Sequence, residues 1–276
     1  MNPRPIGVFD SGVGGLTVFK ALEAALPDES LVYLGDTARV PYGIRSAETV
    51  VRYSREAAHF LDRHRIKILV VACNSASSVA IDVLREQSEI PVLGVIGPGA
   101  RRATAISKQG KIGVIGTRGT IASQAYVKAI HELAPDAEVI SEPCPLFVPL
   151  AEEGWTDDEV ALQVAQRYLT PFKEARIDTL VLGCTHYPLL RGVIQKVMGP
   201  GVTLVDSAET VAAEVREHLK TDMAAEAGEG TGRVEHHFFV TDAPAPFQAV
   251  AERFLGRSLR RLERARIDVE EHDGQA

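Results

Sequence analysis

The chain alternates between short runs of apolar residues and longer segments in which apolar residues recur with a helical period. The short runs are rich in Val, Ile and Leu and do not alternate with polar residues, which is typical of strands covered on both faces of a sheet. We expect strands at Ile6–Phe9, Leu31–Leu34, Ile68–Ala72, Val92–Val95, Ile112–Ile115, Val139–Ser141, Thr179–Leu182, Thr203–Val205 and Val234–Val240.

The longer amphipathic segments between these runs predict helices. We expect them at Leu16–Leu26, Ala47–His64, Ser78–Gln87, Ile121–Leu133, Asp157–Ala175, Leu189–Met198 and Ala208–Leu219. A repeated order of strand and helix indicates parallel sheets with right-handed crossovers. The predicted fold class is therefore α/β.

The same order of features occurs twice. The opening Ile6-Gly7-Val8 recurs as Ile112-Gly113-Val114, and Cys73 and Cys184 each end an apolar strand. The period is far longer than that of a solenoid repeat. The sequence therefore predicts two similar parallel-sheet α/β lobes related by pseudo-two-fold symmetry.

The expected boundaries follow from this internal symmetry. Residues 1–96 form the first lobe, residues 97–206 form the second, and residues 207–276, which hold no third copy of the pattern, return to complete the first. The acidic, glycine-containing Thr221–Gly232 is expected to be a surface loop, and the tail after Ile267 is expected to fray.

Composition narrows the class of protein. The 276 residues carry a formal net charge of −7, which argues against a general nucleic-acid binder because such proteins need a basic surface. No apolar run approaches the length of a membrane span, and no signal peptide is visible. Three cysteines are too few for a disulfide framework in a chain of this size. We therefore expect a cytoplasmic protein without membrane or nucleic-acid partners.

A glycine-rich segment, Phe9–Thr17, lies where the first strand meets the first helix. Glycines let the backbone approach a bound anion, and the N–H groups at a helix start attract negative charge. It is not a dinucleotide fingerprint, which would need glycine in place of Thr17. A tight turn with Asp10 or Ser11 as the helix cap explains the segment equally well.

Two cysteines carry the strongest chemical signal. Cys73 and Cys184 each stand at the carboxyl end of a buried strand, before small polar residues and a helix, where open α/β sheets bind ligands. A helix start also favours the thiolate. A lone cysteine in such a place is more often a small core residue. Because two cysteines stand at matching positions in two similar lobes, we favour a chemical role for both.

If the lobes face each other, the two thiols approach one ligand from opposite sides. That geometry suits the removal of a proton from one face of a carbon and the return of a proton to the other face. A thiol with a reference pKa of about 8.5 reaches either protonation state near neutrality. A redox dithiol is a competing interpretation, although no C-x-x-C motif is present, and the spacing around Cys184 and His186 does not resemble a zinc site.

Other residues are candidates to assist these thiols. His186, two residues beyond Cys184, could polarise that thiol or carry its proton. Asp10 and Glu152 are candidate acid–base groups, one from each half, although the sequence does not separate Glu152 from its neighbour Glu153. Cys144, between two prolines, is expected to be buried and inert.

Two turns are candidates to hold a ligand. Pro41-Tyr42-Gly43 could direct backbone N–H groups at a carboxylate, and Thr117, after a strand of the second lobe, could offer a hydroxyl. An ordinary loop and a plain helix cap explain the two turns as well. Adjacent His236 and His237 fall in a strand pattern that points them in opposite directions, so we assign them no chemistry.

Taken together, these motifs resemble the glutamate racemase family. The resemblance rests on residues 9–15, on Gly35-Asp36-Thr37 leading to Pro41-Tyr42-Gly43, on Ala72-Cys73-Asn74 and on Gly183–Pro188, together with Gly116-Thr117, Ser123, the Pro149–Gly154 loop and Val205-Asp206-Ser207. It covers most of the chain, from about Ile6 to past Thr210, and its combination of motifs is highly specific.

The resemblance implies interconversion of L- and D-glutamate in a cleft between two lobes, without a cofactor or metal, to supply D-glutamate for peptidoglycan. By motif position it implies that Cys73 and Cys184 are the catalytic thiols, assisted by Asp10, Glu152 and His186. The implied substrate-binding residues are Asp10, Ser11, Pro41, Tyr42, Gly43, Asn74, Ser75, Thr117, Thr185 and His186.

One residue departs from the family pattern, which commonly has Thr where this chain has Ser75. The hydroxyl is kept, so a contact to a carboxylate is expected to survive. The resemblance further implies a homodimer and regulation by a cell-wall precursor or by DNA gyrase, although no residue here is tied to either. Racemisation of aspartate, non-catalytic binding of an acidic metabolite and dithiol redox chemistry stay open as alternatives.

Overall fold

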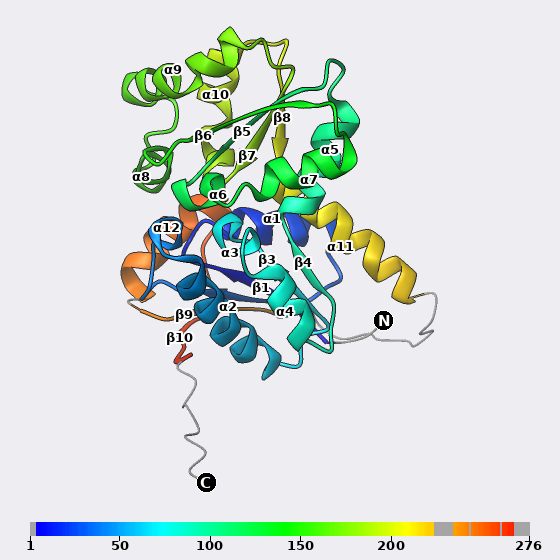
Figure 1. Ribbon diagram of the computed structural model, residues 1–276. Helices are drawn as coiled ribbons and strands as arrows, with labels where there is room; N and C mark the ends of the chain where they lie inside the picture. Colours follow the sequence, from blue (N-terminus) through cyan, green and yellow to red (C-terminus); the bar gives the residue numbers. More distant parts are fainter. Residues whose placement is uncertain (1–3, 224–233, 243, 260, 268–276) are drawn as a thin grey trace.

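The computed structural model describes residues 4–223, 234–242, 244–259 and 261–267, and these form two parallel β-sheets surrounded by helices (Figure 1). The larger sheet has the strand order β10-β9-β2-β1-β3-β4 and the smaller has the order β6-β5-β7-β8. The strands are β1 (Ile6–Asp10), β2 (Leu31–Gly35), β3 (Ile68–Val71), β4 (Val92–Gly94), β5 (Lys111–Gly116), β6 (Glu138–Pro143), β7 (Thr179–Gly183), β8 (Thr203–Asp206), β9 (His236–Val240) and β10 (Leu262–Arg264).

The two sheets share one plan. The order β2-β1-β3-β4 in the larger sheet matches β6-β5-β7-β8 in the smaller, and every pairing is parallel. The predicted fold class of two similar parallel-sheet α/β lobes is confirmed. The larger sheet also contains β9 and β10 from the far end of the chain, with Leu31 of β2 opposite His236 of β9.

Helices and 3₁₀ turns join the strands. They are α1 (Leu16–Ala25), η1 (Tyr42–Ile44), α2 (Ala47–Asp62), α3 (Asn74–Ser77), α4 (Ile81–Gln87), α5 (Ile96–Ile106), α6 (Arg118–Ala122), α7 (Ala125–Leu133), α8 (Phe147–Glu153), α9 (Glu159–Glu174), η2 (Tyr187–Leu190), α10 (Arg191–Met198), α11 (Ser207–Met223) and α12 (Pro244–Leu255). Most coincide with the predicted helices within a few residues.

Some predicted elements are wrong in detail. The helix expected at Ile121–Leu133 is broken into α6 and α7 because Gln124 adopts a left-handed conformation, with φ of 58°. The helix expected from Ser78 begins at Ile81, after the separate short helix α3. The strand expected from Val234 begins at His236.

Helices α5, α8 and α12 and strand β10 were not expected. Helix α5 forms despite Gly97, Pro98 and Gly99 in its first turn, where a proline is tolerated because the N–H it lacks would be unpaired there. Helix α8 forms in the segment expected to be an irregular loop, with Pro149 also near its start. In the expected loop at 221–232, α11 continues to Met223, and residues 224–232 lie outside the described residues, as does the tail after Ile267.

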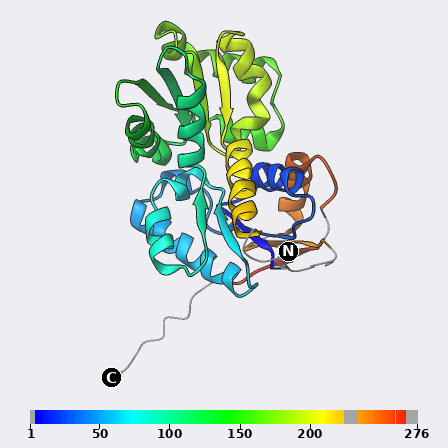
Figure 2. The same cartoon turned by 90° about the vertical axis from the view of Figure 1, so that its right-hand side faces the viewer.

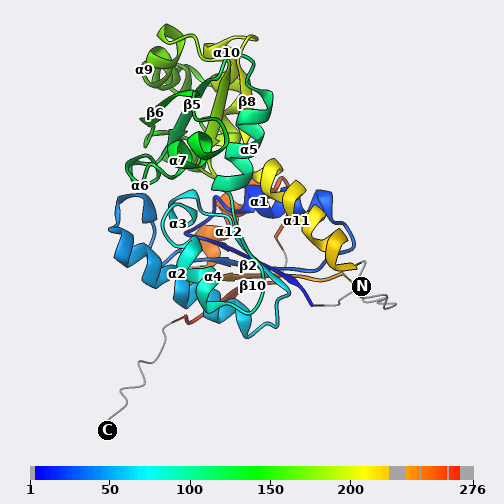
Figure 3. The same cartoon turned by 45° about the vertical axis from the view of Figure 1, so that its right-hand side comes forward.

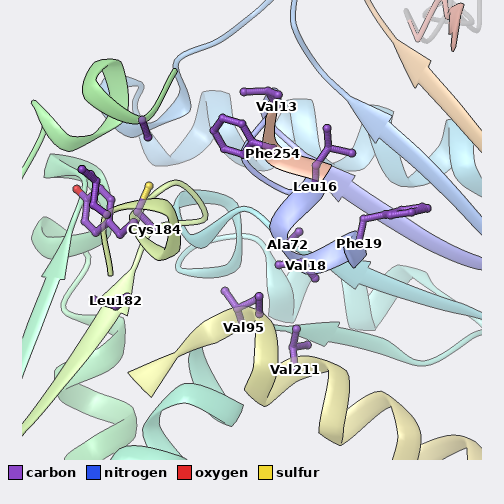
Figure 4. Packing of buried hydrophobic residues seen from close by; sticks show 14 of the residues in the cluster. Val13, Leu16, Val18, Phe19, Ala72, Val95, Leu182, Cys184, Val211 and Phe254 are labelled. Carbon is purple, nitrogen blue, oxygen red and sulfur yellow. The ribbon is translucent and has the colours of Figure 1, made fainter. Parts of the chain in front are cut away.

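One buried hydrophobic cluster extends from the larger sheet into the smaller (Figure 4). It contains Val13, Leu16 and Phe19 on one side and Leu182 and Cys184 on the other. Helix α11, which follows β8 of the smaller sheet, packs against α1 and α5, and Figures 2 and 3 show it running along the larger sheet. The two regions are therefore joined by a shared core.

Within residues 4–223, 234–242, 244–259 and 261–267, no helix is long and apolar enough to cross a membrane.

Candidate active site between the two sheets

The two candidate thiols occupy equivalent places in the matching sheets. Cys73 follows β3 after a single residue and caps α3, and Cys184 directly follows β7. Each thiol residue is only 5% exposed. The strand order places β3 beside β1 and β7 beside β5, so each cysteine lies next to the strand that opens its sheet.

Cys73 lies beside residues that follow β1. Phe9 is opposite Val71 in the parallel register, so Ser11 and Cys73 leave the sheet side by side. The Cys73 thiol is 3.5 Å from Ser11 Oγ. Burial, together with the nearby Asp10 carboxylate, raises the pKa of the Cys73 thiol to about 12. Cys73 therefore holds its proton at neutral pH.

Asp10 is a buried carboxylate with one oxygen free for a ligand. Its Oδ2 accepts a hydrogen bond of 2.9 Å from the Gly12 N–H, whereas its Oδ1 has no hydrogen-bond partner among the described residues. Burial raises the Asp10 pKa, and the positive charge of His186 acts against that rise. An acceptor without a partner is costly in a buried place, which marks Oδ1 as an atom for a bound donor.

The second thiol has a different set of neighbours. His186 Nδ1 lies 3.9 Å from Cys184 Sγ, and His186 Nε2 lies 2.8 Å from Glu152 Oε1. Glu152 is contributed by α8 and Glu153 is exposed, so Glu152 is the glutamate that faces the histidine. Cys184, His186 and Glu152 therefore form a chain of groups able to exchange protons.

Two opposing influences act on the pKa of His186. Burial lowers the pKa, but hydrogen bonds to Cys184 and Glu152 outweigh burial and raise it to about 10. The imidazole therefore carries a positive charge near neutrality, and this charge lies beside the Cys184 sulfur.

Contacts between the sheets join the strand ends that carry the two thiols. Thr17 Oγ1 at the start of α1 donates to the carbonyl oxygen of Thr185 over 2.9 Å, and Gly14 packs so closely on Thr185 and His186 that a methyl group there would overlap both. The residues that follow β1, the strand beside β3 and Cys73, and those that follow Cys184 therefore pack against each other across the boundary between the two sheets.

Hydroxyl groups meet at the same boundary. Ser75 Oγ, after β3, lies 2.9 Å from Thr117 Oγ1, after β5, and 3.3 Å from Thr120 Oγ1. Gly43 packs directly on Thr117, because an added Cβ would lie 2.7 Å from the threonine Cβ. The residue types predicted for carboxylate binding are therefore assembled from three separate parts of the chain.

The Tyr42 side chain is buried and hydrogen-bonded within the protein, so it does not face a ligand. Its side chain is 1% exposed and its hydroxyl donates to Asp36 Oδ2. Asp36 also accepts hydrogen bonds from Arg39 Nε at 2.7 Å and from Thr241 Oγ1 at 2.8 Å. The turn at Pro41–Gly43 can therefore offer a ligand its backbone, with the Tyr42 side chain as an anchor.

Asn74 reaches the site with a free donor. Its Oδ1 accepts a 2.8 Å hydrogen bond from the Tyr126 hydroxyl of α7, whereas its buried Nδ2 has no hydrogen-bond partner among the described residues. Asn74 Nδ2 and Asp10 Oδ1 are thus one donor and one acceptor, both buried and both open to a ligand.

Several residues of the site were not expected from the sequence. Tyr126 lies in the helix predicted at Ile121–Leu133 and Thr120 directly precedes that helix, and the sequence pattern gives no sign that either residue reaches the other sheet. Phe254 of α12 packs edge-on against the His186 ring, and Arg253 contacts the Glu152 backbone. No local motif marks these residues, because their partners are far away in the sequence.

Three other residues singled out in the sequence are assigned no role in the site. Cys144 is fully buried, burial raises its pKa, and its nearest polar partner is the Glu142 carbonyl, as expected of an inert thiol. His236 and His237 are both partly exposed on β9. All three cysteines are free, and within the described ranges no group of three or more His, Cys, Asp or Glu residues could hold a metal ion.

Comparisons with known proteins agree with this arrangement. A model of the Asp/Glu/Hydantoin racemase family matches residues 6–215. The glutamate racemase of Geobacter metallireducens is 55% identical over 97% of this chain and 98% of its own length.

Solved structures give the same result. The glutamate racemase of Francisella tularensis in complex with D-glutamate superposes with a TM-score of 0.89 at 38% identity, covering 97% of this chain and 99% of its own. Escherichia coli glutamate racemase in complex with L-glutamate and the activator UDP-MurNAc-Ala has a TM-score of 0.78 at 30% identity, covering 95% of this chain and 98% of its own.

Proposed function

The chain belongs to the Asp/Glu/Hydantoin racemase family, among the glutamate racemases, and we propose that it interconverts L- and D-glutamate with Cys73 and Cys184 as opposed acid and base. The observation that carries this proposal is the pair of buried thiols at equivalent strand ends of two matching sheets, joined by contacts between those ends. No cofactor is needed in this scheme, because both proton transfers use side chains of the chain itself.

The neighbours of each thiol indicate which cysteine removes a proton first and which delivers one. A thiolate at Cys184, stabilised by the charged His186, removes the α-proton of the enantiomer whose α-hydrogen faces it, and Cys73 delivers its proton to the opposite face. The product leaves with Cys184 protonated and Cys73 ionised, which is the form needed for the reverse reaction. The raised pKa values of Cys73 and His186 support this assignment.

The unpartnered polar atoms match the groups of an α-amino acid. Asp10 Oδ1 would accept a hydrogen bond from the ammonium, and Asn74 Nδ2 would donate one to a carboxylate. Donors around a carboxylate also stabilise the negative charge that spreads into it as the α-proton leaves. We assign the remaining contacts to the hydroxyls of Ser11, Ser75, Thr117 and Thr185 and to the backbone of Pro41, Tyr42 and Gly43.

Replacing each cysteine by alanine tests the assignment. We expect Cys73→Ala and Cys184→Ala each to lower kcat by at least about 10³-fold, because one of two obligatory proton transfers is lost. Cys144→Ala is the matched control, because its thiol is also buried and contacts the Glu142 backbone carbonyl. Full racemase activity in Cys73→Ala or Cys184→Ala would contradict the proposal.

The wider role rests on the same assignment. We propose that the chain supplies D-glutamate for peptidoglycan in the cytoplasm, that it acts as a homodimer, and that a cell-wall precursor regulates it, as the activator named for the Escherichia coli structure suggests. We also propose domain boundaries at residues 1–96 with 207–276 for one lobe and 97–206 for the other. Rescue of a strain that requires D-glutamate would test the biosynthetic role.

A further inference from the structure

The C-terminal end of helix α12 contacts His186 and Glu152, the two residues that can exchange protons with Cys184. This helix follows β9 of the larger sheet and packs against α1, whereas His186 and Glu152 follow elements of the smaller sheet. The Phe254 ring lies edge-on to the His186 ring, with centroids 5.3 Å apart and an interplanar angle of 82°. Phe254 is 4% exposed and belongs to the buried cluster that contains Cys184 (Figure 4).

The preceding residue contacts the other member of the pair. Arg253 Nη1 donates a hydrogen bond to the backbone carbonyl of Glu152, the last residue but one of α8. Gly154, two residues after Glu152, ends α8 with φ of 81°. An added Cβ there would lie 3.2 Å from the Arg253 guanidinium. Two adjacent residues of α12 therefore contact both His186 and Glu152.

An apolar ring in this place has two effects on the imidazole. It blocks rotation of His186 away from Glu152 and Cys184, and it keeps water from one side of the ring, which strengthens the charged hydrogen bond to Glu152. Both effects act on Cys184 through His186. The hydrogen-bonding neighbour of Cys73 is instead Ser11, held on the turn between β1 and α1.

We propose that Phe254 is a positioning residue that fixes His186 for proton transfer at Cys184, so that its loss impairs one of the two proton transfers more than the other. The inference rests on the proposed two-thiol function. Arg253 supports the same arrangement from the Glu152 side and has the smaller effect, because it is exposed.

Elimination from 3-chloroglutamate separates the two proton transfers. The α-C–H bond breaks to a thiolate, the electron pair forms a C=C bond, and the C–Cl bond breaks to release chloride. Water then hydrolyses the enamine to 2-oxoglutarate and ammonia. Each enantiomer needs only the thiolate that faces its α-hydrogen, so Cys184→Ala identifies the enantiomer that depends on Cys184, and Cys73→Ala identifies the other.

We expect Phe254→Ala to slow elimination from the Cys184-dependent enantiomer by about tenfold, because the base is displaced, and to leave the other enantiomer within about twofold. Phe254→Leu, which keeps apolar bulk, should recover most of this rate and serves if the alanine variant does not fold. Arg253→Ala should show a smaller loss with the same preference. Phe247→Ala removes a buried ring two turns earlier on α12 and should affect both enantiomers equally.

Two results would overturn the inference. Equal slowing of both enantiomers in the Phe254 variants, as in Phe247→Ala, would show a structural role only, and unchanged rates for both would show none. If the Cys73→Ala and Cys184→Ala variants themselves lacked opposite preferences, the proposed two-thiol function would fail and the inference with it.

Discussion

His186 Nε2 lies 2.8 Å from Glu152 Oε1, and this hydrogen bond joins the residues that follow β7 to helix α8. The imidazole is 8% exposed, so the contact holds a charged group in a buried place. Cys73 has no comparable cationic neighbour in the contacts above. The two thiols are thus chemically different although their positions in the sheets are equivalent.

Stability should depend on pH through His186. Its pKa rises from 6.5 to about 10 in the folded chain, so between these values the folded state binds a proton that the unfolded state has released. The stabilisation is complete below pH 6.5 and is lost as pH rises through 10. We expect the free energy of unfolding in urea to fall from pH 7 to pH 8, before ionisation of the unfolded Cys73 and Cys144 thiols adds to the decline at higher pH.

His186→Asn is the matched variant for this measurement, because it removes the titrating group while keeping a polar side chain. The slope of stability against pH should flatten in the variant. An unchanged slope would show that another group causes the dependence.

Removal of the Asp36 carboxylate should destabilise the fold. Asp36 is fully buried and accepts hydrogen bonds from Tyr42, Arg39 and Thr241, so Asp36→Ala removes the acceptor of the Tyr42 hydroxyl, Arg39 Nε and the Thr241 hydroxyl. We expect a loss of about 3 kcal/mol in urea unfolding, with a raised KM for glutamate because the Pro41–Gly43 turn is released.

Asp82→Ala is the control for Asp36. The Asp82 side chain is 95% exposed and 4.0 Å from Arg85, so its loss should change stability by less than about 0.5 kcal/mol. Similar losses in the two variants would contradict a specific role for the Asp36 hydrogen bonds.

Gly14 should tolerate no side chain. A Cβ at this position would overlap Thr185 and His186 across the boundary between the two sheets, so Gly14→Ala must displace residues beside Cys184. We expect kcat/KM to fall by about 10²-fold, as for other displacements of catalytic groups.

Gly192→Ala provides the comparison, because the same methyl group on helix α10 would meet no atom of the described residues within 4 Å, apart from its chain neighbours and its own helix backbone. That variant should keep full activity and gain up to about 1 kcal/mol of stability from the helix preference of alanine. Normal activity in Gly14→Ala would show that the close approach is not needed.

The sequence predicted the elements best where one physical signal dominated. Uninterrupted apolar runs predicted β1 and β3, because a parallel strand that is buried on both faces consists almost entirely of apolar residues. Helices α5 and α8 were missed because Pro98 and Pro149, usually signs of a break, stand in first turns where proline is compatible with a helix.

The site was predictable where chemistry and position coincide, as at Cys73 and Cys184 on the strand ends. Contacts between distant segments were not predictable, because a buried phenylalanine such as Phe254 has the pattern of any core residue. The register that brings Ser75 to Thr117 likewise depends on how the two sheets meet, which no local pattern specifies.

Racemisation in D₂O tests the central claim most directly. When L-glutamate is converted to a small extent, two opposed thiols predict D-glutamate that carries deuterium at the α-carbon, while the remaining L-glutamate keeps its protium. The same labelling should hold in reverse from D-glutamate. Product that retains the original α-proton would show that a single base serves both faces, and would contradict the roles assigned to Cys73 and Cys184.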